Sequence, residues 1–346
     1  MYRVRHQLAT NDDWLALAQE DTLEPDLPIC DSHHHLWDHC PDLVEPRYLL
    51  DEILTDLNSG HNIISTVFVQ CGAMHKADGP EAMRVVGETE FVNGIAAMSA
   101  SGAYGPTRIA AGIVGQVDLT LGDAVAPVLE AHLQAGGGRF RGIRHSVAWD
   151  PSGTAPEPPY QAVTHPHLYL DAGYRTGFAQ LGHYGMSFEG WCYHHQIPEL
   201  TDLAGAFPDT TIILNHFGGP LGVGPYADRR DEILSQWRQD ITELATCENV
   251  MAKLGGINME RNGFGWHERE RPPTSQELME ATRPYYEHAI EQFGVDRCLF
   301  ESNYPVDKVS CNYNVLWNSF KRLTAQYSAD EKAKLFHDTA TRVYRL

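Results

Sequence analysis

The sequence predicts a (β/α)8 barrel, in which eight parallel strands alternate with helices around a closed sheet. Eight short apolar or β-rich runs alternate with longer amphipathic stretches along most of the 346 residues, which is typical of repeated βαβ units. The GxGxxG fingerprint of a doubly wound open sheet, the alternative fold, does not follow the first run. We therefore expect an irregular N-terminal arm over residues 1–27, with a short helix over 12–20. Residues 28–346 are expected to form a single barrel whose sheet can be distorted.

The expected elements follow in chain order. The strands are Pro28–His33, Ile63–Gln70, Ile109–Val117, Phe140–His145, Met186–Cys192, Thr211–His216, Val250–Leu254 and Cys298–Asn303. The helices are Glu81–Ala100, Asp123–Ala135, Leu168–His183, Ile197–Phe207, Asp228–Thr246, Ser275–Phe293, Tyr313–Tyr327 and Ala329–Tyr344. Two long segments, 150–167 and 255–275, follow the fourth and seventh strands. They are expected to wall the end of the barrel where such folds keep their sites.

The composition excludes several classes of protein. Asp and Glu number 46 against 26 Lys and Arg, and a net charge of −20 argues against binding to nucleic-acid phosphates. No apolar run is long enough for a membrane span, and residues 1–20 lack the apolar core of a signal peptide. The seven cysteines form no CxxC pair and are expected to be reduced, as in a cytoplasmic protein. A small molecule is the expected partner, and a homo-oligomer is left open.

The chain contains 18 histidines, and three of them end the first strand. Because side chains alternate along a strand, His33 and His35 are expected on one face and His34 on the other. Two imidazoles converging inside a barrel suit one divalent ion. The alternative is a polar strand end that carries three unrelated histidines.

Polar side chains gather at the ends of the other strands as well. The fourth to eighth strands carry or lead into Arg141, Arg144, His194, His216, Lys253, Glu301 and Asn303. These positions meet at one end of a parallel barrel, where catalytic groups are found. The presence of polar residues at the ends of several strands indicates an active site more specifically than any single motif does.

Five motifs give the chain a family resemblance. They are Asp31-Ser-His-His-His-Leu-Trp-Asp38, Phe140-Arg-Gly-Ile-Arg-His145, Leu214-Asn-His-Phe-Gly-Gly219, Met251-Ala-Lys-Leu-Gly-Gly256 and Phe300-Glu-Ser-Asn-Tyr-Pro-Val-Asp307. In order and spacing the chain resembles the amidohydrolase superfamily, specifically the amidohydrolase-2 group of barrel hydrolases. This group includes sugar-acid lactonases and 2-pyrone-4,6-dicarboxylate lactonase, and its more distant relatives are metal-dependent decarboxylases.

The resemblance implies roles for individual residues. His33, His35 and His194 match metal ligands of the family. His195, the next residue, is the alternative to His194 as the third ligand. The implied cofactor is a divalent metal, zinc in the first place and manganese as the alternative. His216 matches a catalytic or polarising histidine near the metal. Arg141 and Arg144 match arginines that hold substrate carboxylates.

The resemblance fails at the eighth strand. The family has an aspartate there that binds metal and accepts a proton from water, whereas this chain has Asn303. An amide cannot act as that base. Glu301 and Asp307 are both available as substitutes, and the sequence does not choose between them. The binding of a metal is therefore open as well.

The first hypothesis is a hydrolase that opens a lactone, or a related ester, of a carboxylated sugar acid or aromatic catabolite. In this hypothesis His216 stabilises the oxyanion, Glu301 or Asp307 takes the proton of water, and Arg144, Arg141 or Lys253 binds an anionic group. Trp37 and Tyr193 are expected to wall a ring-shaped substrate, with core packing as the alternative. A metal-dependent decarboxylase or hydratase, a metal-free lactonase and a non-catalytic ligand-binding barrel are the competing hypotheses.

Overall fold

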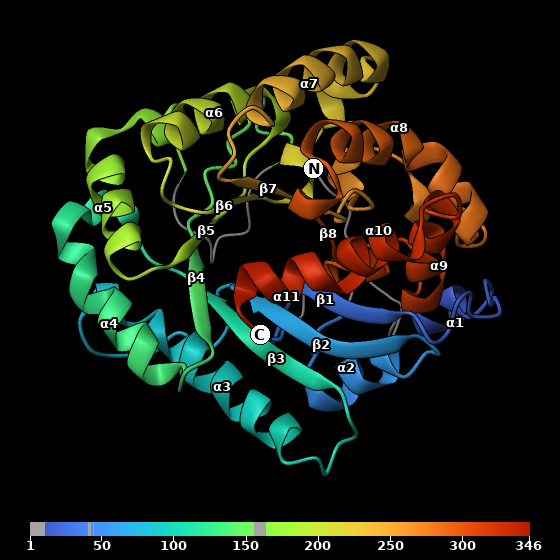
Figure 1. Ribbon diagram of the computed structural model, residues 1–346, viewed down its shortest axis with the longest axis horizontal. Coiled ribbons are helices and arrows are strands. Elements are labelled where there is room, and N and C mark those ends of the chain that lie inside the picture. Colours follow the sequence, from blue (N-terminus) through green and yellow to red (C-terminus); the bar gives the residue numbers. More distant parts are fainter. Residues whose placement is uncertain (1–10, 41–42, 44, 156–163) are drawn as a thin grey trace.

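The computed structural model describes residues 11–40, 43, 45–155 and 164–346. Residues 1–10 of the predicted arm and 156–163 of the predicted loop lie outside the described residues. In the described ranges, eight parallel strands form one sheet in sequential order from β1 to β8 (Figure 1). They are β1 Pro28–His34, β2 Asn62–Val69, β3 Arg108–Gly115, β4 Phe140–Arg144, β5 Ser187–Gly190, β6 Ile212–Leu214, β7 Val250–Leu254 and β8 Cys298–Phe300. The predicted (β/α)8 barrel is confirmed, and each predicted strand contains or overlaps an observed one.

The barrel is nearly closed, and β8 meets β1 mainly beyond its own last residue. The backbone N–H of His35 donates to Tyr304 O at 2.8 Å, and that of Asn303 donates to His33 O at 2.9 Å. The buried Asp31 carboxylate reinforces this seam by accepting hydrogen bonds from Ser302 N and the Tyr313 hydroxyl, each at 2.9 Å. The seam therefore joins the two segments that carry the first-strand histidines and the eighth-strand polar residues.

Helices surround the sheet and mostly follow the predicted positions. They are α1 Asp12–Leu15, α2 Leu50–Leu57, α3 Val86–Ala100, α4 Ala126–Ala135, α5 Ala172–His183, α6 Ile197–Ala206, α7 Arg230–Leu244, α8 Ser275–Phe293, α9 Tyr313–Leu323, α10 Ala329–Ala333 and α11 Thr339–Tyr344. Helix α2 was not predicted, because it spans only two turns, although its apolar residues Leu50, Ile53 and Leu57 follow helical spacing. The helix predicted over Ala329–Tyr344 joined α10 to α11, which a wider π-helical turn over Lys334–Asp338 separates. No helix in the described ranges has both the length and the apolar character needed to cross a bilayer.

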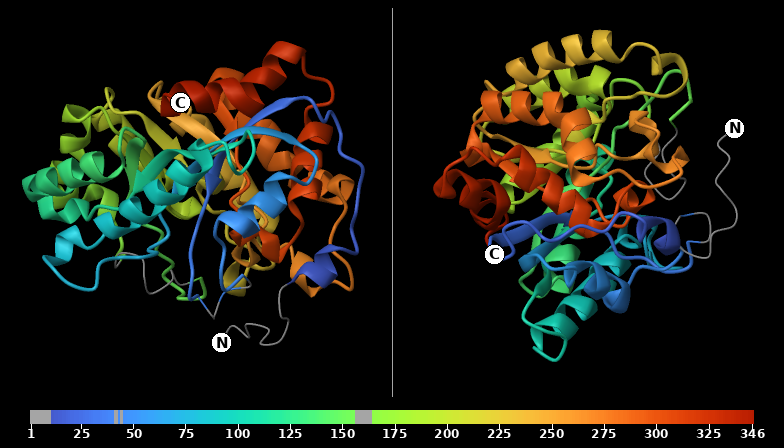
Figure 2. Two further views of the ribbon diagram at one scale, coloured as in Figure 1. Left: turned by 90° about the horizontal axis from the view of Figure 1, so that it is seen from below. Right: turned by 90° about the vertical axis from the view of Figure 1, so that its right-hand side faces the viewer.

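The interior of the barrel has an apolar floor. Inward side chains of β1, β2, β3, β6, β7 and β8 form one buried cluster with Ala340, Val343 and Tyr344 of α11. The C-terminal helix therefore closes one end of the barrel, as Figure 2 shows from the side. Because Tyr344 packs beneath the strands, the polar residues at their carboxyl ends lie at the opposite end.

The described part of the arm, residues 11–27, packs along α9. Asn312 Nδ2 donates to Ala18 O at 2.6 Å, and Lys321 Nζ donates to Leu23 O at 2.7 Å and Glu24 O at 2.9 Å. The short helix predicted over 12–20 ends at Leu15. The arm is thus attached to the barrel by hydrogen bonds to side chains of the C-terminal helices.

Candidate active site

The first strand places two of its three terminal histidines together. His33 Nε2 lies 3.2 Å from His35 Nε2, and both side chains are buried. His34 points the other way, where its Nε2 lies 2.8 Å from Thr66 Oγ1 and its ring meets the edge of Phe68. The alternation of side chains predicted for this segment therefore holds in the structure.

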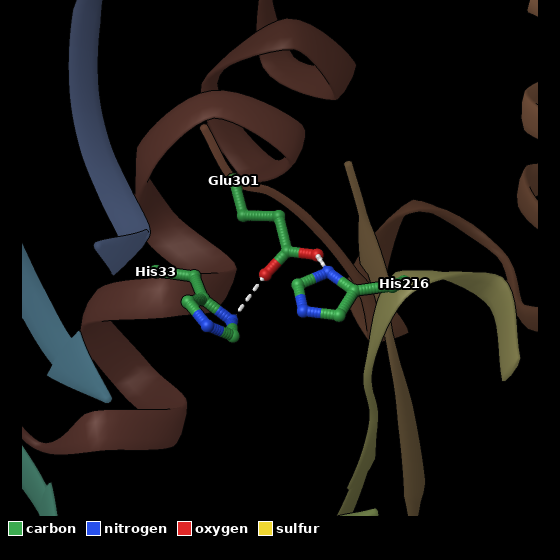
Figure 3. Close-up of side chains that lie close together, drawn as sticks. All are labelled: His33, His216 and Glu301. Carbon is green, nitrogen blue, oxygen red and sulfur yellow. Dashed lines mark hydrogen bonds and ion pairs between the residues drawn. The ribbon is translucent and has the colours of Figure 1, made fainter. Parts of the chain in front are cut away.

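Glu301, just after β8, joins the first-strand histidines to the sixth strand. Its Oε2 lies 2.7 Å from His33 Nδ1, and its Oε1 lies 2.7 Å from His216 Nδ1 (Figure 3). His216 follows β6 with a left-handed backbone, φ +50°, and its ring lies against the backbone of Gly256. A Cβ atom at position 256 would lie 1.9 Å from His216 Nδ1, so only glycine fits beside this imidazole.

The hydrogen bonds of the histidines determine where their lone pairs point. His33 Nδ1 lies 2.7 Å from Glu301 Oε2, and His35 Nδ1 lies 2.8 Å from the carbonyl oxygen of Val69. A carbonyl oxygen can only accept, so the neutral His35 ring holds its proton on Nδ1 and presents an unprotonated Nε2 to His33. Two nitrogen ligands of a tetrahedral zinc ion are about 3.3 Å apart, which matches the observed 3.2 Å.

The donor set around these atoms fits a divalent metal. In the described part of the chain, His33, His216 and Glu301 form a group of three potential ligands whose ligand atoms all lie within 4.8 Å of one another. With His35 beside His33, the site offers imidazole nitrogens and a carboxylate, which are the ligands that zinc and manganese take.

Two cationic side chains lie against the same cluster. Arg144 Nη1 is 3.4 Å from His33 Nε2, and Arg144 also donates hydrogen bonds to Gln70 O and, at 3.5 Å, to Asn215 Oδ1. Lys253 Nζ lies 3.4 Å from His33 Nδ1 and forms a buried ion pair with Glu189 Oε2 at 2.9 Å. The cluster therefore places carboxyl groups beside cationic groups within the buried interior.

Burial shifts the proton affinities of the cluster. It lowers the pKa of His33, His35 and His216 well below the usual value, and the nearby charges of Lys253 and Arg144 lower it further. These imidazoles are therefore neutral at pH 7, as a ligand or a general base must be. Burial raises the pKa of Glu301 to about 8, so this carboxyl exchanges a proton near neutral pH.

Asn303 and Asp307, the other eighth-strand candidates, form a pair of their own. Asn303 Nδ2 donates to Asp307 Oδ1 at 2.8 Å, and Asn258 N donates to Asp307 Oδ2 at 3.2 Å. Burial raises the pKa of Asp307 to about 7. Asn303 has a left-handed backbone, φ +57°, which asparagine adopts more readily than most residues. Of the two carboxylates that the sequence offered, Glu301 is the one that contacts His33 and His216.

Several predicted site residues lie elsewhere. The Arg141 guanidinium donates to Gly138 O and Phe140 O at the start of β4, at the closed end of the barrel, so the structure does not bring it into the histidine cluster. His194 is not part of the three-ligand group among the described residues. Its ring packs against Tyr226, and its Nδ1 accepts a hydrogen bond from Leu221 N at 3.4 Å. The structure offers His216 and Glu301 beside His33 in place of His194.

The predicted aromatic walls and the predicted lysine anchor are held by internal contacts. Trp37 stacks on His35 with ring centroids 6.0 Å apart, and its Nε1 donates to Glu45 O at 2.7 Å. The Tyr193 hydroxyl donates to Ala155 O at 2.8 Å and accepts from Arg261. Lys253 reaches the cluster, but its charge faces Glu189. Trp37 therefore supports a site histidine from behind.

Glu189 and Asn215 also belong to the cluster, although neither was predicted from the sequence as a site residue. Glu189 lies in the fully buried strand β5, accepts a hydrogen bond from Asn215 Nδ2 at 2.5 Å and pairs with Lys253. A charged residue inside the otherwise apolar run 186–192 was the available signal, because such a residue needs a buried partner. The sequence could not name that partner, because Lys253 lies two strands away.

Comparison with known proteins extends these observations. A model of the Amidohydrolase family matches residues 30–346. An uncharacterized protein, y4mH, of Sinorhizobium fredii is 33% identical over 339 residues, which cover 93% of this chain and 99% of that protein. L-fucono-1,5-lactonase of Burkholderia multivorans is 26% identical over 240 residues, 69% of this chain and 72% of its own. A solved structure of an amidohydrolase from Burkholderia multivorans with bound zinc shares the barrel fold, with a TM-score of 0.68 at 22% identity. The match covers 92% of this chain and 99% of that chain.

Proposed function

Because the chain belongs to the amidohydrolase family, we propose that it is a hydrolase that opens a lactone, or a related ester, of a small hydroxylated or carboxylated acid. One observation carries this proposal. Glu301 joins His33 and His216 within a buried cluster that also contains His35 and Arg144, at the carboxyl ends of the strands. Barrel enzymes keep their reacting groups at this end.

The hydrogen-bond pattern assigns a role to each residue in the proton transfer. His216 holds its proton on Nδ1 toward Glu301, so its neutral Nε2 can accept a proton from an attacking water. The ionised form of Glu301 then stabilises the imidazolium and can take the Nδ1 proton. Because the pKa of Glu301 is raised to about 8, this form becomes more populated as the pH rises toward 8. This relay replaces the roles expected from the sequence, in which His216 donated a hydrogen bond and a carboxylate acted on water directly.

The cofactor of the proposal is a divalent metal, zinc or manganese, held by His33 and His35 with Glu301 or His216 beside them. When bound, such an ion supplies Lewis-acid polarisation of the ester carbonyl and acidifies water. The contact of His33 Nδ1 with Glu301 and the hydrogen bond of His35 Nδ1 to Val69 O would leave the two Nε2 atoms available to hold it.

Buried acceptor oxygens after three strands support a hydroxylated substrate as part of this proposal. Gln70 Oε1, Gln116 Oε1 and Asn258 Oδ1 follow β2, β3 and β7, and no hydrogen-bond donor reaches them from the described residues. Hydroxyl groups of a substrate would satisfy such acceptors. The similarity to L-fucono-1,5-lactonase supports the same choice, a lactone of a polyhydroxy acid, and the Arg144 charge suits its developing carboxylate.

The test combines metal analysis with a substrate panel. We expect the purified protein to contain about one divalent ion per chain, and His35→Gln to lose it. We expect aldonolactones to be hydrolysed with release of one proton each, and Glu301→Gln to lower kcat by about 100-fold because its amide cannot take the proton. His288→Gln on α8, outside the cluster, is the matched control and is expected to keep full activity.

Other outcomes would redirect the assignment. Release of carbon dioxide from carboxylated aromatics would identify a decarboxylase. No turnover on any lactone, ester or carboxylated aromatic would favour a ligand-binding barrel.

A metal-free lactonase is the second candidate, and the position of Arg144 favours it. Its Nη1 lies 3.4 Å from His33 Nε2, so a cationic donor already reaches this imidazole nitrogen. The guanidinium can bind the developing oxyanion in place of an ion. This candidate predicts lactonase activity that chelators leave unchanged, together with loss of that activity in Arg144→Gln.

A further inference from the structure

A chain of buried polar groups connects the closed end of the barrel with the histidines. The Tyr344 hydroxyl of α11 donates a hydrogen bond to Glu189 Oε1 of β5. The other carboxylate oxygen, Glu189 Oε2, lies 2.9 Å from Lys253 Nζ of β7, which lies 3.4 Å from His33 Nδ1. Tyr344, Glu189 and Lys253 are fully buried, so solvent does not weaken these contacts.

The same carboxylate directs a second branch toward the site. Asn215 Nδ2 donates to Glu189 Oε2 at 2.5 Å, and Asn215 Oδ1 accepts a hydrogen bond from Arg144 Nη1 at 3.5 Å. That guanidinium nitrogen is the one nearest His33 Nε2. Glu189 therefore supports both cationic groups that face His33, the lysine directly and the arginine through Asn215.

Tyr344 is well placed to orient this carboxylate. Its hydroxyl is the donor at Oε1, and its ring lies beneath Lys253, with Nζ 5.4 Å from the ring centroid. Ala340 and Val343 of the same helix pack in the apolar floor, so the helix is held in place independently of the polar contact. A buried carboxylate that lost this donor would rotate or draw in another group, because an unsatisfied buried charge is costly.

We propose that Tyr344, at the closed end of the barrel, is a positioning residue of the active site. By fixing Glu189 it sets the positions of Lys253 and Asn215, and through them those of His33 and Arg144. The inference concerns the site of the proposed function and rests on that function only for its kinetic readout.

The experiment compares two hydroxyl deletions, Tyr344→Phe and Tyr48→Phe. Tyr48 is the matched control because it is also fully buried and its hydroxyl donates to a carboxylate, Asp56 Oδ2 at 2.7 Å, outside the barrel interior. The ring-nitrogen NMR signals of His33 are measured at a single pH in protein labelled with 15N-histidine, and they are assigned by their loss in His33→Gln. We expect Tyr344→Phe to shift them and Tyr48→Phe to leave them unchanged. On a substrate that is turned over, kcat should fall about tenfold in Tyr344→Phe relative to Tyr48→Phe.

The spectroscopic readout decides the matter without a substrate. If folded Tyr344→Phe gives the wild-type His33 signals, the positioning role is wrong even if the protein is a lactonase. If the signals shift but no substrate is turned over, the positioning role stands and the proposed function fails. Should Tyr344→Phe not fold, Glu189→Gln replaces it. That variant is expected to shift the same signals, and unchanged signals would overturn the proposal.

Discussion

Asn303 is the residue at which this chain departs from the family it resembles, and its side chain has a defined partner. It donates a hydrogen bond to the buried Asp307, while Glu301, two residues earlier, provides the carboxylate that contacts His33 and His216. An aspartate at 303 would face Asp307 as a second carboxylate. The amide therefore avoids repulsion between two buried carboxylates at this point.

We expect Asn303→Asp to lower both stability and activity. The new carboxylate loses the donor to Asp307 Oδ1 and places two acidic groups in contact, at a cost of about 1–3 kcal/mol in the free energy of unfolding at pH 8. The cost should shrink at pH 6, because the pair then shares a proton. Urea unfolding at the two pH values measures it. Asn58→Asp, at the exposed end of α2, is the control and should stay within about 0.5 kcal/mol of the wild type.

A rise in activity would contradict this interpretation. If Asn303→Asp hydrolysed the substrate faster than the wild type, position 303 would be a disabled base and Asp307 only a neighbour.

At the scale of single residues, the sequence predicted which side chains share a face of a strand, but not which side chains contact one another. Strand alternation placed His33 and His35 on one face, because period two is a local property of the backbone. It could not choose Glu301 over Asp307, because the choice depends on where His216 lies, 85 residues away. Nor could it show that Arg141 lies outside the histidine cluster, because the reach of a long side chain depends on its surroundings.

At the scale of elements, one lysine joins three segments beside the site. Lys308 Nζ lies 3.3 Å from Asp12 of α1, 3.4 Å from Glu45 and 3.7 Å from Asp56 of α2. Lys308 directly follows Asp307 in the short helix Val306–Val309. The arm therefore meets the strand-eight segment through this ion cluster, and Asn11 Nδ2 adds a hydrogen bond to Lys308 O at 3.1 Å.

We expect Lys308→Met to destabilise the protein by about 2–4 kcal/mol at pH 7.5, because it leaves three carboxylates facing one another without a cation. Burial already raises the pKa of Glu45 and Asp56, and Lys308 opposes that rise. Without the lysine these groups take up protons more readily, so the destabilisation should lessen at pH 5. Guanidinium unfolding at both pH values tests this.

Lys76→Met is the matched control, because Lys76 pairs with Glu90 on the exposed surface, where such pairs contribute little. Equal losses in the two variants would show that the Lys308 cluster is no more than a surface ion pair.

The sequence predicted the elements more completely than the contacts between them. Alternating apolar and amphipathic runs placed every strand of the described sheet, because each run is long enough to show its own periodicity. The missed helix α2 is short, and the split between α10 and α11 depends on a wider turn within an unbroken amphipathic pattern. The role of α11 as the floor of the barrel follows from packing across the sheet, which no local pattern encodes.

At the scale of the whole molecule, two sets of buried groups titrate in opposite senses. Burial lowers the pKa to about 4 for His34, His61, His132, His145 and His194. Burial raises the pKa of several carboxyls, among them Asp31 to about 6, Glu88 and Asp307 to about 7 and Glu301 to about 8. At each pH, the stability rises or falls with pH according to whether the unfolded or the folded chain binds more protons.

We expect the stability to be greatest near pH 6.5. Between about pH 4 and 6.5 the unfolded chain binds more protons at its histidines than the folded chain does, which makes stability rise with pH. The buried carboxyls with raised pKa values act in the opposite sense, but they are fewer than the buried histidines, so the rise prevails. Above pH 6.5 the unfolded histidines are neutral, whereas the folded chain still holds protons on Glu88, Asp307 and Glu301, so stability falls as the pH rises to about 8. Thermal unfolding in the presence of a chelator should show a midpoint lower by roughly 3 °C at pH 8 than at pH 6.5. A midpoint that rises steadily from pH 6.5 to 8 would show that these carboxyls are already ionised in the folded protein near neutral pH, which would contradict their raised pKa values.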